Sequence, residues 1–120
     1  MSKMNSIVDI IEAGIRTESL RQKTIANNVA NLETPGYRRL DVKFKELLAK
    51  ALDCSGSVDL SEIEAQIYQP KNTAVKSNGN DVSLEVEVGE MVKNTLRHKT
   101  YIQLLKKRYQ QIELAMNVGR

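Results

Sequence analysis

The sequence contains no tryptophan, only one phenylalanine and four tyrosines among its 120 residues. Large aromatic side chains fill much of the core of a compact globule, so their scarcity argues against such a core. Hydrophobic residues still make up 41% of the chain, and most of them are aliphatic. This composition favours one elongated domain in which aliphatic helices pack as a pair or bundle.

Cysteine and histidine occur once each, as Cys54 and His98. One cysteine can form no internal disulfide, and the two residues together cannot supply a zinc site. His98 falls among aliphatic residues at helical spacing, which is typical of a packed residue. Glu62 and Glu64 flank an alternating stretch and are expected to face solvent rather than act as an acid/base pair. We therefore expect no catalytic residue, no cofactor, no metal and no enzyme activity.

Long hydrophobic runs are also lacking. No stretch approaches the roughly 20 apolar residues of a transmembrane helix, so no membrane-spanning segment is expected. Asp9 and Glu12 interrupt the apolar residues near the start, which argues against a secretory signal peptide. The net charge of +3 is too small to indicate a nucleic-acid partner. By composition alone, the chain is expected to be cytoplasmic.

Two long segments carry apolar residues at alternating steps of three and four, the spacing of coiled-coil helices. One runs from Met4 to Leu32 and the other from Leu84 to Met116. The second predicts a helix over 84–117, roughly 50 Å long. The predicted seam consists of Val8, Ile11, Ile15, Ile25 and Val29 in the first helix and of Leu84, Val88, Met91, Ile102, Leu105, Tyr109 and Ile112 in the second.

Polar residues interrupt both seams near their middles, and an antiparallel register in which Gln22 faces His98 would bring them together. A parallel pair would bring the same positions close, so the pattern alone leaves the orientation open. Both helices also carry apolar residues outside the seam. Because two helices cannot cover all of these residues, the sequence predicts association with other copies or other chains.

The region between the helices is less regular. Residues 37–50 include a short amphipathic stretch, either extended or helical, around Val42, Phe44, Leu47 and Leu48. From Asp53 to Asn80 the composition turns to Ser, Gly, Asn and Asp, which favours a flexible connection. The alternating residues 63–68 could form a short strand.

The segment 26–37 predicts the end of the first helix followed by a tight turn. Asparagine tolerates the left-handed conformation that ends many helices, so Asn27, Asn28 and Asn31 are candidate C-terminal caps. Thr34-Pro35-Gly36-Tyr37 predicts a type II turn, with proline at the second position and glycine at the third. On physical grounds alone, a helix stop with no further role explains this segment equally well.

The string Asn-Asn-x-Ala-Asn-x-x-Thr-Pro-Gly-Tyr resembles the signature of the bacterial flagellar rod, hook and hook-associated axial proteins at every fixed position. With its short length and C-terminal heptad helix, the chain most resembles the flagellar basal-body rod protein family. Residues 78–85 and 97–101 resemble that family's C-terminal helix. The resemblance implies that the motif fixes the path of the chain out of an inner helix among packed subunits. The positions that carry this assembly role are Asn27, Asn28, Ala30, Asn31, Thr34, Pro35, Gly36 and Tyr37.

The resemblance also implies the antiparallel orientation. The expected fold is therefore mainly α, with two long terminal helices in an antiparallel coiled coil, joined by a largely irregular middle with a possible short strand. The expected division is 1–37 for the first helix and its turn, 38–80 for a variable connecting region, and 81–120 for the C-terminal helix.

The function implied by the resemblance is that of a structural rod subunit, which packs by its helices into a helical tube after type III export without a cleaved signal peptide. Its expected location is the periplasm-spanning rod of the basal body. Expected partners in this homo- or hetero-oligomeric assembly are other flagellar rod subunits, the rod-to-ring junction protein and the export apparatus.

Two other classes of protein remain possible from the residues alone. A small cytoplasmic coiled-coil adaptor or chaperone would also expose apolar helix surface. Basic residues from Lys93 to Arg108 would suit a nucleic-acid binder, yet they are spread around the helix and lack accompanying aromatic side chains. They fit a solvated helix surface, or a surface that meets acidic patches on neighbouring subunits.

Overall fold

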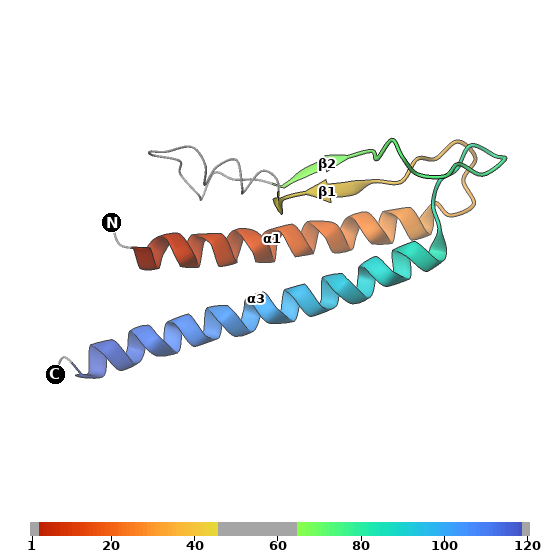
Figure 1. Cartoon of the computed structure of the whole chain (residues 1–120). Helices are drawn as coiled ribbons and strands as arrows, with labels where there is room; N and C mark the ends of the chain where they lie inside the picture. Colours follow the sequence, from red (N-terminus) through yellow and green to blue (C-terminus); the bar gives the residue numbers. More distant parts are fainter. Residues whose placement is uncertain (1–2, 46–64, 119–120) are drawn as a thin grey trace.

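The computed structural model describes residues 3–45 and 65–118. Helix α1 (Lys3–Ala30) is followed by strands β1 (Asp41–Lys43) and β2 (Gln66–Tyr68) and by helix α3 (Leu84–Val118). The two helices run antiparallel, so their connected ends lie together and both termini lie at the other end of the molecule (Figure 1). The predicted pair of long helices is confirmed.

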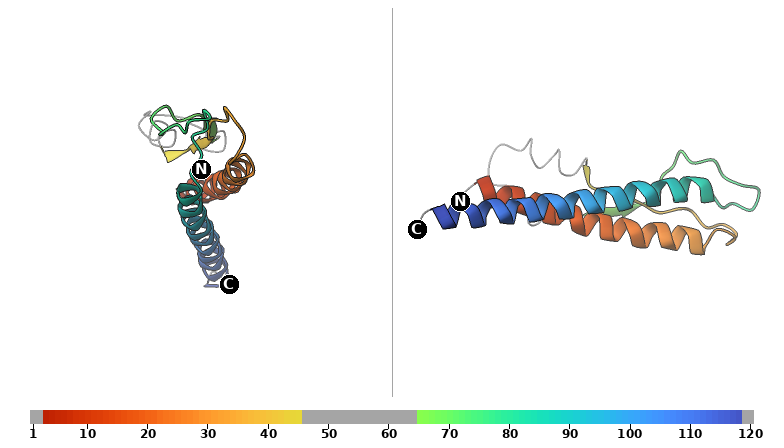
Figure 2. Two further views of the ribbon diagram at one scale, coloured as in Figure 1. Left: turned by 90° about the vertical axis from the view of Figure 1, so that its right-hand side faces the viewer. Right: turned by 90° about the horizontal axis from the view of Figure 1, so that it is seen from below.

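The molecule is long and thin. Its extents are 67 × 29 × 15 Å and its radius of gyration is 18.2 Å. A compact chain of this length would have a radius of gyration of about 14 Å. Figure 2 shows from two further sides that the helices cross obliquely rather than lying strictly parallel.

Gly14 of α1 packs directly against the ring of Tyr101 of α3. A Cβ atom added to Gly14 would lie 2.5 Å from a ring carbon of Tyr101, so only glycine leaves room for the ring. The predicted register, with Gln22 opposite His98, is wrong, because Asn94 donates to the backbone oxygen of Glu18 at 2.7 Å. Gln22 is exposed instead. A seam pattern predicts which residues of each helix face the partner helix. The position of one helix along the other is set instead by the fit of the Tyr101 ring against Gly14.

The strands pair antiparallel, with Asp41 opposite Tyr68 and Lys43 opposite Gln66. This small sheet lies along α1, on the side away from α3 (Figure 1). Strand β2 falls within the alternating run 63–68, so the possible short strand is confirmed. Leu47, Leu48, Cys54, Glu62 and Glu64, which the sequence analysis singled out, lie outside the described residues.

The core is thin, as the scarcity of aromatic residues predicts. Among the described residues, the buried hydrophobic ones are Ile11, Ala13, Ile25, Val42, Phe44 and Val82. Thr17 and Thr24 are also buried, and their hydroxyl groups donate to the carbonyl oxygens of Ala13 and Leu20 one turn earlier. Such bonds satisfy the hydroxyls without any partner on another element.

A candidate assembly site at the helix joint

The turn after α1 has the geometry that its sequence predicts. Gly36 has a φ of 75°, and the Tyr37 amide donates to the Thr34 carbonyl at 3.3 Å. A type II turn needs a positive φ at its third residue, which glycine adopts without steric cost. Thr34, Pro35 and Gly36 are exposed, so the tip of this turn is open to contact.

The asparagines end α1 in a different way from the one predicted. Among the described residues only glycines have a positive φ, so none of Asn27, Asn28 and Asn31 adopts the left-handed conformation. The helix tightens instead, with the Asn31 amide donating to Asn28 and the Leu32 amide to Val29. The Asn31 side chain caps the carbonyl of Asn27 at 2.8 Å. Side-chain hydrogen bonding replaces the left-handed residue as the helix stop.

Asn28 is fully buried and connects α1 to the segment leading into β1. Its Nδ2 donates to the Leu40 carbonyl and its Oδ1 accepts from the Leu40 amide, both at 2.9 Å. The same Oδ1 accepts from the Tyr37 hydroxyl, which in turn accepts from Asn27. The buried side-chain amide of Asn28 therefore hydrogen-bonds both the N–H and the C=O of Leu40, as the backbone of a neighbouring strand would.

A second glycine turn packs against the first. Gly79 has a φ of 84°, and a Cβ atom there would lie 3.3 Å from the Cα of Gly36. The Gly36 amide donates to the Asn78 carbonyl at 2.9 Å, and the Asp81 amide donates to the Tyr37 carbonyl. The two turns are thus held together by backbone bonds, at a distance that only glycine permits comfortably.

Asn80 completes this arrangement and is also fully buried. Its Nδ2 donates to three carbonyl oxygens beyond the end of α1, while its Oδ1 accepts from the Val82 amide at 2.7 Å. The three acceptors belong to Asn31, Leu32 and Thr34. Backbone carbonyls left over at a helix end need such partners, because burying them unpaired is costly.

Charged side chains reinforce the same region. The Arg39 guanidinium donates to Glu87 at 3.0 Å, and both residues are buried. The Arg39 amide donates to Asp81 at 2.5 Å, while Arg38 lies 3.3 Å from the other oxygen of Asp81. Burial alone would lower the pKa of Arg39, but the hydrogen bond and charge of Glu87 outweigh it and raise that pKa. We call residues 27–41 together with 78–87 the helix joint.

A chain of alternating charges extends from the helix joint to the middle of the helix pair. Its members, in spatial order, are Arg97, Glu18, Arg21, Asp41, Arg39 and Glu87. Successive members lie 3.0 to 3.8 Å apart. The chain of charges thus connects α3, α1 and β1.

The joint brings most of the predicted motif together. Asn27, Asn28, Asn31 and Tyr37 form one hydrogen-bonded group, and Gly36 contacts the second turn. Ala30, the last residue of α1, is exposed.

The predicted seam residues are placed differently in the two helices. In α1, Ile11 and Ile25 are buried, and Val8, Ile15 and Val29 are half-buried. In α3, the early seam residues Leu84, Val88 and Met91 are 44–50% exposed, and Tyr109 is 52% exposed. Ile102, Leu105 and Ile112 are half-buried.

Sequence reasoning missed Asn80, Asp81, Arg39 and Glu87. The first two stand in the string 78–85, which carried the family resemblance but was interpreted as a linker. The asparagine after a glycine turn was the available signal there. Arg39 and Glu87 are 48 residues apart, and no local pattern connects them.

Two negative findings concern the described residues. Within 3–45 and 65–118, no group of three or more His, Cys, Asp or Glu residues could hold a metal ion. In the same ranges, neither helix has an apolar stretch that would cross a membrane.

Comparison with known proteins adds evidence from outside the structure. Residues 13–38, which are the last two thirds of α1 and the following turn, match the family model described as flagella basal body rod protein. The chain is 24% identical to the flagellar basal body rod protein FlgB of Bacillus subtilis, over the whole of both chains. It is 30% identical to FlgB of Cereibacter sphaeroides, covering 81% of this chain and 87% of that one. The FlgB protein of Aquifex aeolicus is 31% identical, with 68% and 69% covered.

Proposed function

Since the chain belongs to the FlgB family of flagellar basal body rod proteins and is a structural, non-enzymatic rod subunit, we propose that it assembles by packing an exposed stripe of α3 against neighbouring helices. Membership of this family sets aside the alternative of a cytoplasmic adaptor. The proposed product is a helical tube, in which each chain supplies one antiparallel helix pair.

The observation that carries this proposal is the apolar stripe itself. Leu84, Val88, Met91, Val92 and Leu96 are 44–61% exposed. Steps of four connect Leu84, Val88, Val92 and Leu96, and Met91 follows Val88 by three, so all five lie on one side of the first half of α3. Monomeric proteins rarely leave such continuous apolar surface in water, and it usually marks an interface. The stripe includes three of the predicted seam residues, and we propose that these pack between subunits.

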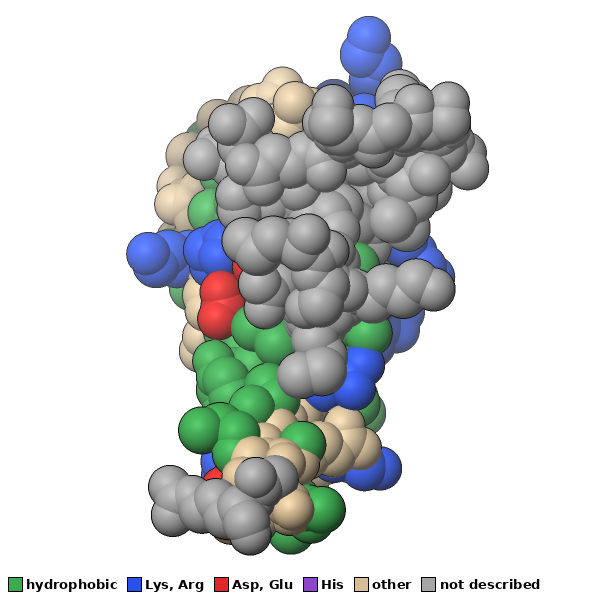
Figure 3. Space-filling model, turned by 90° about the vertical axis from the view of Figure 1, so that its left-hand side faces the viewer, with side chains coloured by type: hydrophobic (Ala, Val, Ile, Leu, Met, Phe, Trp, Pro, Cys, Tyr) green, Lys and Arg blue, Asp and Glu red, His purple; other side chains and the backbone are tan. Residues whose placement is uncertain are grey.

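A second group of exposed hydrophobic residues lies near the end of α3, where Leu114 and Met116 are 64% and 66% exposed. Figure 3 views the molecule from the end that carries both termini, and hydrophobic side chains gather there below the residues drawn in grey. Both ends of α3 therefore offer apolar surface that α1 does not cover. This supports contacts with more than one neighbour.

We infer that different segments of the chain have different roles in the assembly. Residues 1–37 and 81–120 would form one inner helical domain, and residues 38–80 would form a connecting region on its outside. The motif residues would fix the direction in which the chain leaves α1, since they hold the two glycine turns together. Substituting Pro35→Ala together with Gly36→Val is expected to block motility while leaving expression unchanged.

The proposed partners are other flagellar rod subunits and the rod-to-ring junction protein, and the proposed route is type III export without a cleaved signal peptide. The rod would then cross the periplasm. Secretion into the medium should disappear in cells that lack the type III export apparatus. A chain that is still secreted from such cells would contradict this route.

The stripe can be tested with a matched pair of variants. Val88 and Val86 are 50% and 49% exposed, yet two residues apart they lie on opposite sides of the helix. We expect Val88→Asn to abolish swimming in a complementation assay, because it puts an amide into the apolar interface, and Val86→Asn to retain most of it. Equal swimming of the two variants would refute an interface centred on the stripe. Circular dichroism of the purified variants checks that both remain helical.

A further inference from the structure

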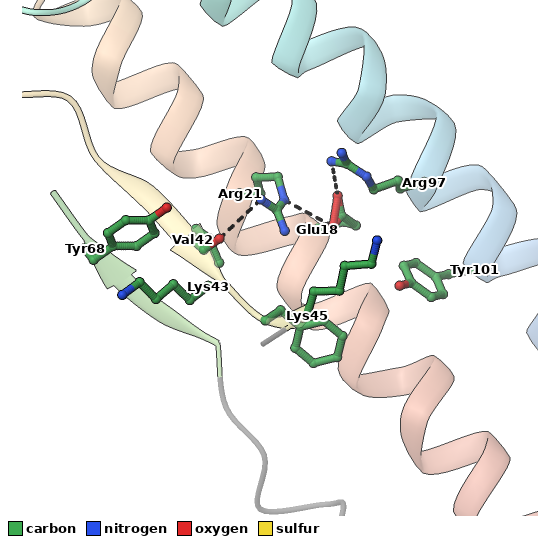
Figure 4. A pocket seen from close by; sticks show the side chains of 9 residues that line it. Glu18, Arg21, Val42, Lys43, Lys45, Tyr68, Arg97 and Tyr101 are labelled. Atoms are coloured by element: carbon green, nitrogen blue, oxygen red, sulfur yellow. Dashed lines mark hydrogen bonds and ion pairs between the residues drawn. The ribbon is translucent and has the colours of Figure 1, made fainter. Parts of the chain in front are cut away.

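A cavity of about 290 Å³ lies in the middle of the molecule, where the small sheet meets the helix pair. Helix α1 contributes Glu18 and Arg21, strand β1 contributes Lys43, and α3 contributes Arg97 and Tyr101. Figure 4 shows these side chains arranged around a common space, with Lys45 extending toward Arg97 and Tyr101. Nothing in the rod function described above uses this cavity.

Positive charge dominates the lining. Four cations, Arg21, Lys43, Lys45 and Arg97, surround one carboxylate, Glu18. Glu18 is 3% exposed and already paired, since Arg21 lies 3.3 Å from one of its oxygens and Arg97 lies 3.5 Å from the other. Among the described residues, no carboxylate lies within ion-pair distance of Lys43 or Lys45. Arg21 also lies 3.8 Å from Asp41, so the excess of positive charge in the cavity comes from Lys43 and Lys45.

The remaining walls are apolar or aromatic. Val42 and Phe44 are buried beside the cavity, and the rings of Tyr68 and Tyr101 line it. The Lys43 ammonium lies 4.3 Å from the centre of the Tyr68 ring, which holds this charge at the cavity wall. An apolar wall with converging cations suits a side chain that has a hydrocarbon stem and an anionic end.

We propose that this cavity is a binding site for an acidic side chain, glutamate or aspartate, on a neighbouring protein segment. Charge complementarity favours a carboxylate, and the buried Glu18 on one wall disfavours the higher negative charge of a phosphate group. Identifying the neighbour as another rod subunit rests on the function proposed above. The binding chemistry itself does not depend on it.

The test uses the full chain and short synthetic peptides. Hexaglutamate is added to isotope-labelled protein, and chemical shifts are followed by NMR, with hexaglutamine as the uncharged control. We expect hexaglutamate, but not hexaglutamine, to shift the signals of Val42, Tyr68 and Tyr101. Binding should weaken with added salt, because exposed charges are screened.

Two double variants separate the cavity from general attraction to a basic protein. Lys43→Gln with Lys45→Gln removes two cavity cations, and Lys106→Gln with Lys107→Gln removes two exposed cations of α3 that do not line the cavity. We expect roughly tenfold weaker binding for the first and less than about twofold for the second. Equal weakening by both, shifts confined to the signals of Lys106 and Lys107, or equal shifts with both peptides would overturn the proposal.

This result is independent of the swimming assay on the stripe. Suppose that the Lys43→Gln, Lys45→Gln variant loses peptide binding while Val88→Asn and Val86→Asn swim equally well. The cavity proposal would then stand, and the proposal for the stripe would be rejected. The converse result would reject only the cavity. Inorganic phosphate, titrated separately, should give weaker cavity shifts than hexaglutamate. Tighter binding of phosphate would overturn the assignment to a carboxylate.

Discussion

The Tyr37 hydroxyl lies between two amide side chains, donating to Asn28 and accepting from Asn27. Burial raises the pKa of this phenol above its usual value of 10.0. The hydrogen bond from Asn27 opposes the rise, and the negative charge of Glu87 adds to it. Deprotonation would also remove the proton that Tyr37 donates to Asn28. The ionised form is therefore poorly accommodated in the folded chain.

Because the folded pKa of Tyr37 exceeds the unfolded one, its contribution to stability is complete below about pH 10 and is lost as the pH rises through the folded pKa. We predict that the difference in unfolding free energy between the wild type and Tyr37→Phe shrinks above about pH 10. Urea unfolding at a series of pH values measures it. A difference that stays constant through this range would contradict the assigned role of the hydroxyl.

Local sequence patterns predicted the structural roles of some of these residues but not of others. Pro35 and Gly36 are neighbours in the chain, so the turn could be predicted from their own conformational preferences. Asn28 could be assigned to the end of a helix, but its bonds to Leu40 and Tyr37 depend on where the chain goes next. Asn80 bonds to carbonyls 46 to 49 residues earlier, and no local preference encodes such a partner.

At the scale of the elements, Gly14 sets how closely the two helices approach. Alanine at an interior helix position normally adds about 1 kcal/mol to stability relative to glycine. Here the added methyl group would meet the Tyr101 ring at 2.5 Å, and overpacking of this kind costs about 1–3 kcal/mol. We predict that Gly14→Ala lowers the midpoint of thermal unfolding measured by circular dichroism.

The matched control removes the ring. In a Tyr101→Ala background the same Gly14→Ala substitution should raise the unfolding midpoint, because only the gain in helix propensity remains. If Gly14→Ala were stabilising in both backgrounds, the close approach of α1 and α3 would not be a constraint on the fold.

The bounds of α3 could be predicted well, whereas the face it turns to α1 could not. Of the positions that share one heptad repeat, residues 84 and 91 are exposed, whereas residues 105 and 112 are partly covered. A strict seven-residue repeat drifts by about 20° per heptad around a straight helix, or about 80° over these four heptads. The heptad positions near the start of α3, beside the helix joint, therefore face away from α1. There the inward positions are Glu87 and Asn94.

At the scale of the whole molecule, the buried pair Arg39–Glu87 holds the start of α3 to the segment that enters the sheet. Glu87 is fully buried, and its second oxygen has no hydrogen-bond partner among the described residues. Removing one charge from a fully buried pair costs about 3–5 kcal/mol. Asp41, 3.5 Å from Arg39, still offsets part of the remaining charge, so the lower part of this range applies here. We predict that Glu87→Gln destabilises the chain by an amount in this range, measured by urea unfolding.

Glu90→Gln is the control on the same helix, since Glu90 pairs with the exposed Lys93 at 3.4 Å. Such surface pairs contribute about 1 kcal/mol or less. Replacing both buried partners, with Arg39→Met and Glu87→Leu, should recover part of the stability lost in Glu87→Gln. Similar losses for Glu87→Gln and Glu90→Gln would mean that the buried pair has no special structural role.

The back-to-back glycine turns have a mechanical consequence. They fasten the two helices at one end, and the contact of Gly14 with Tyr101 holds the pair together near its middle. Beyond Tyr101, α3 extends for 17 residues, roughly 25 Å. A rotation of about 5° about this contact displaces the far end of α3 by about 2 Å. The turns and the glycine–tyrosine contact together thus set the tolerance with which the C-terminal end of α3 can be aligned with its neighbours.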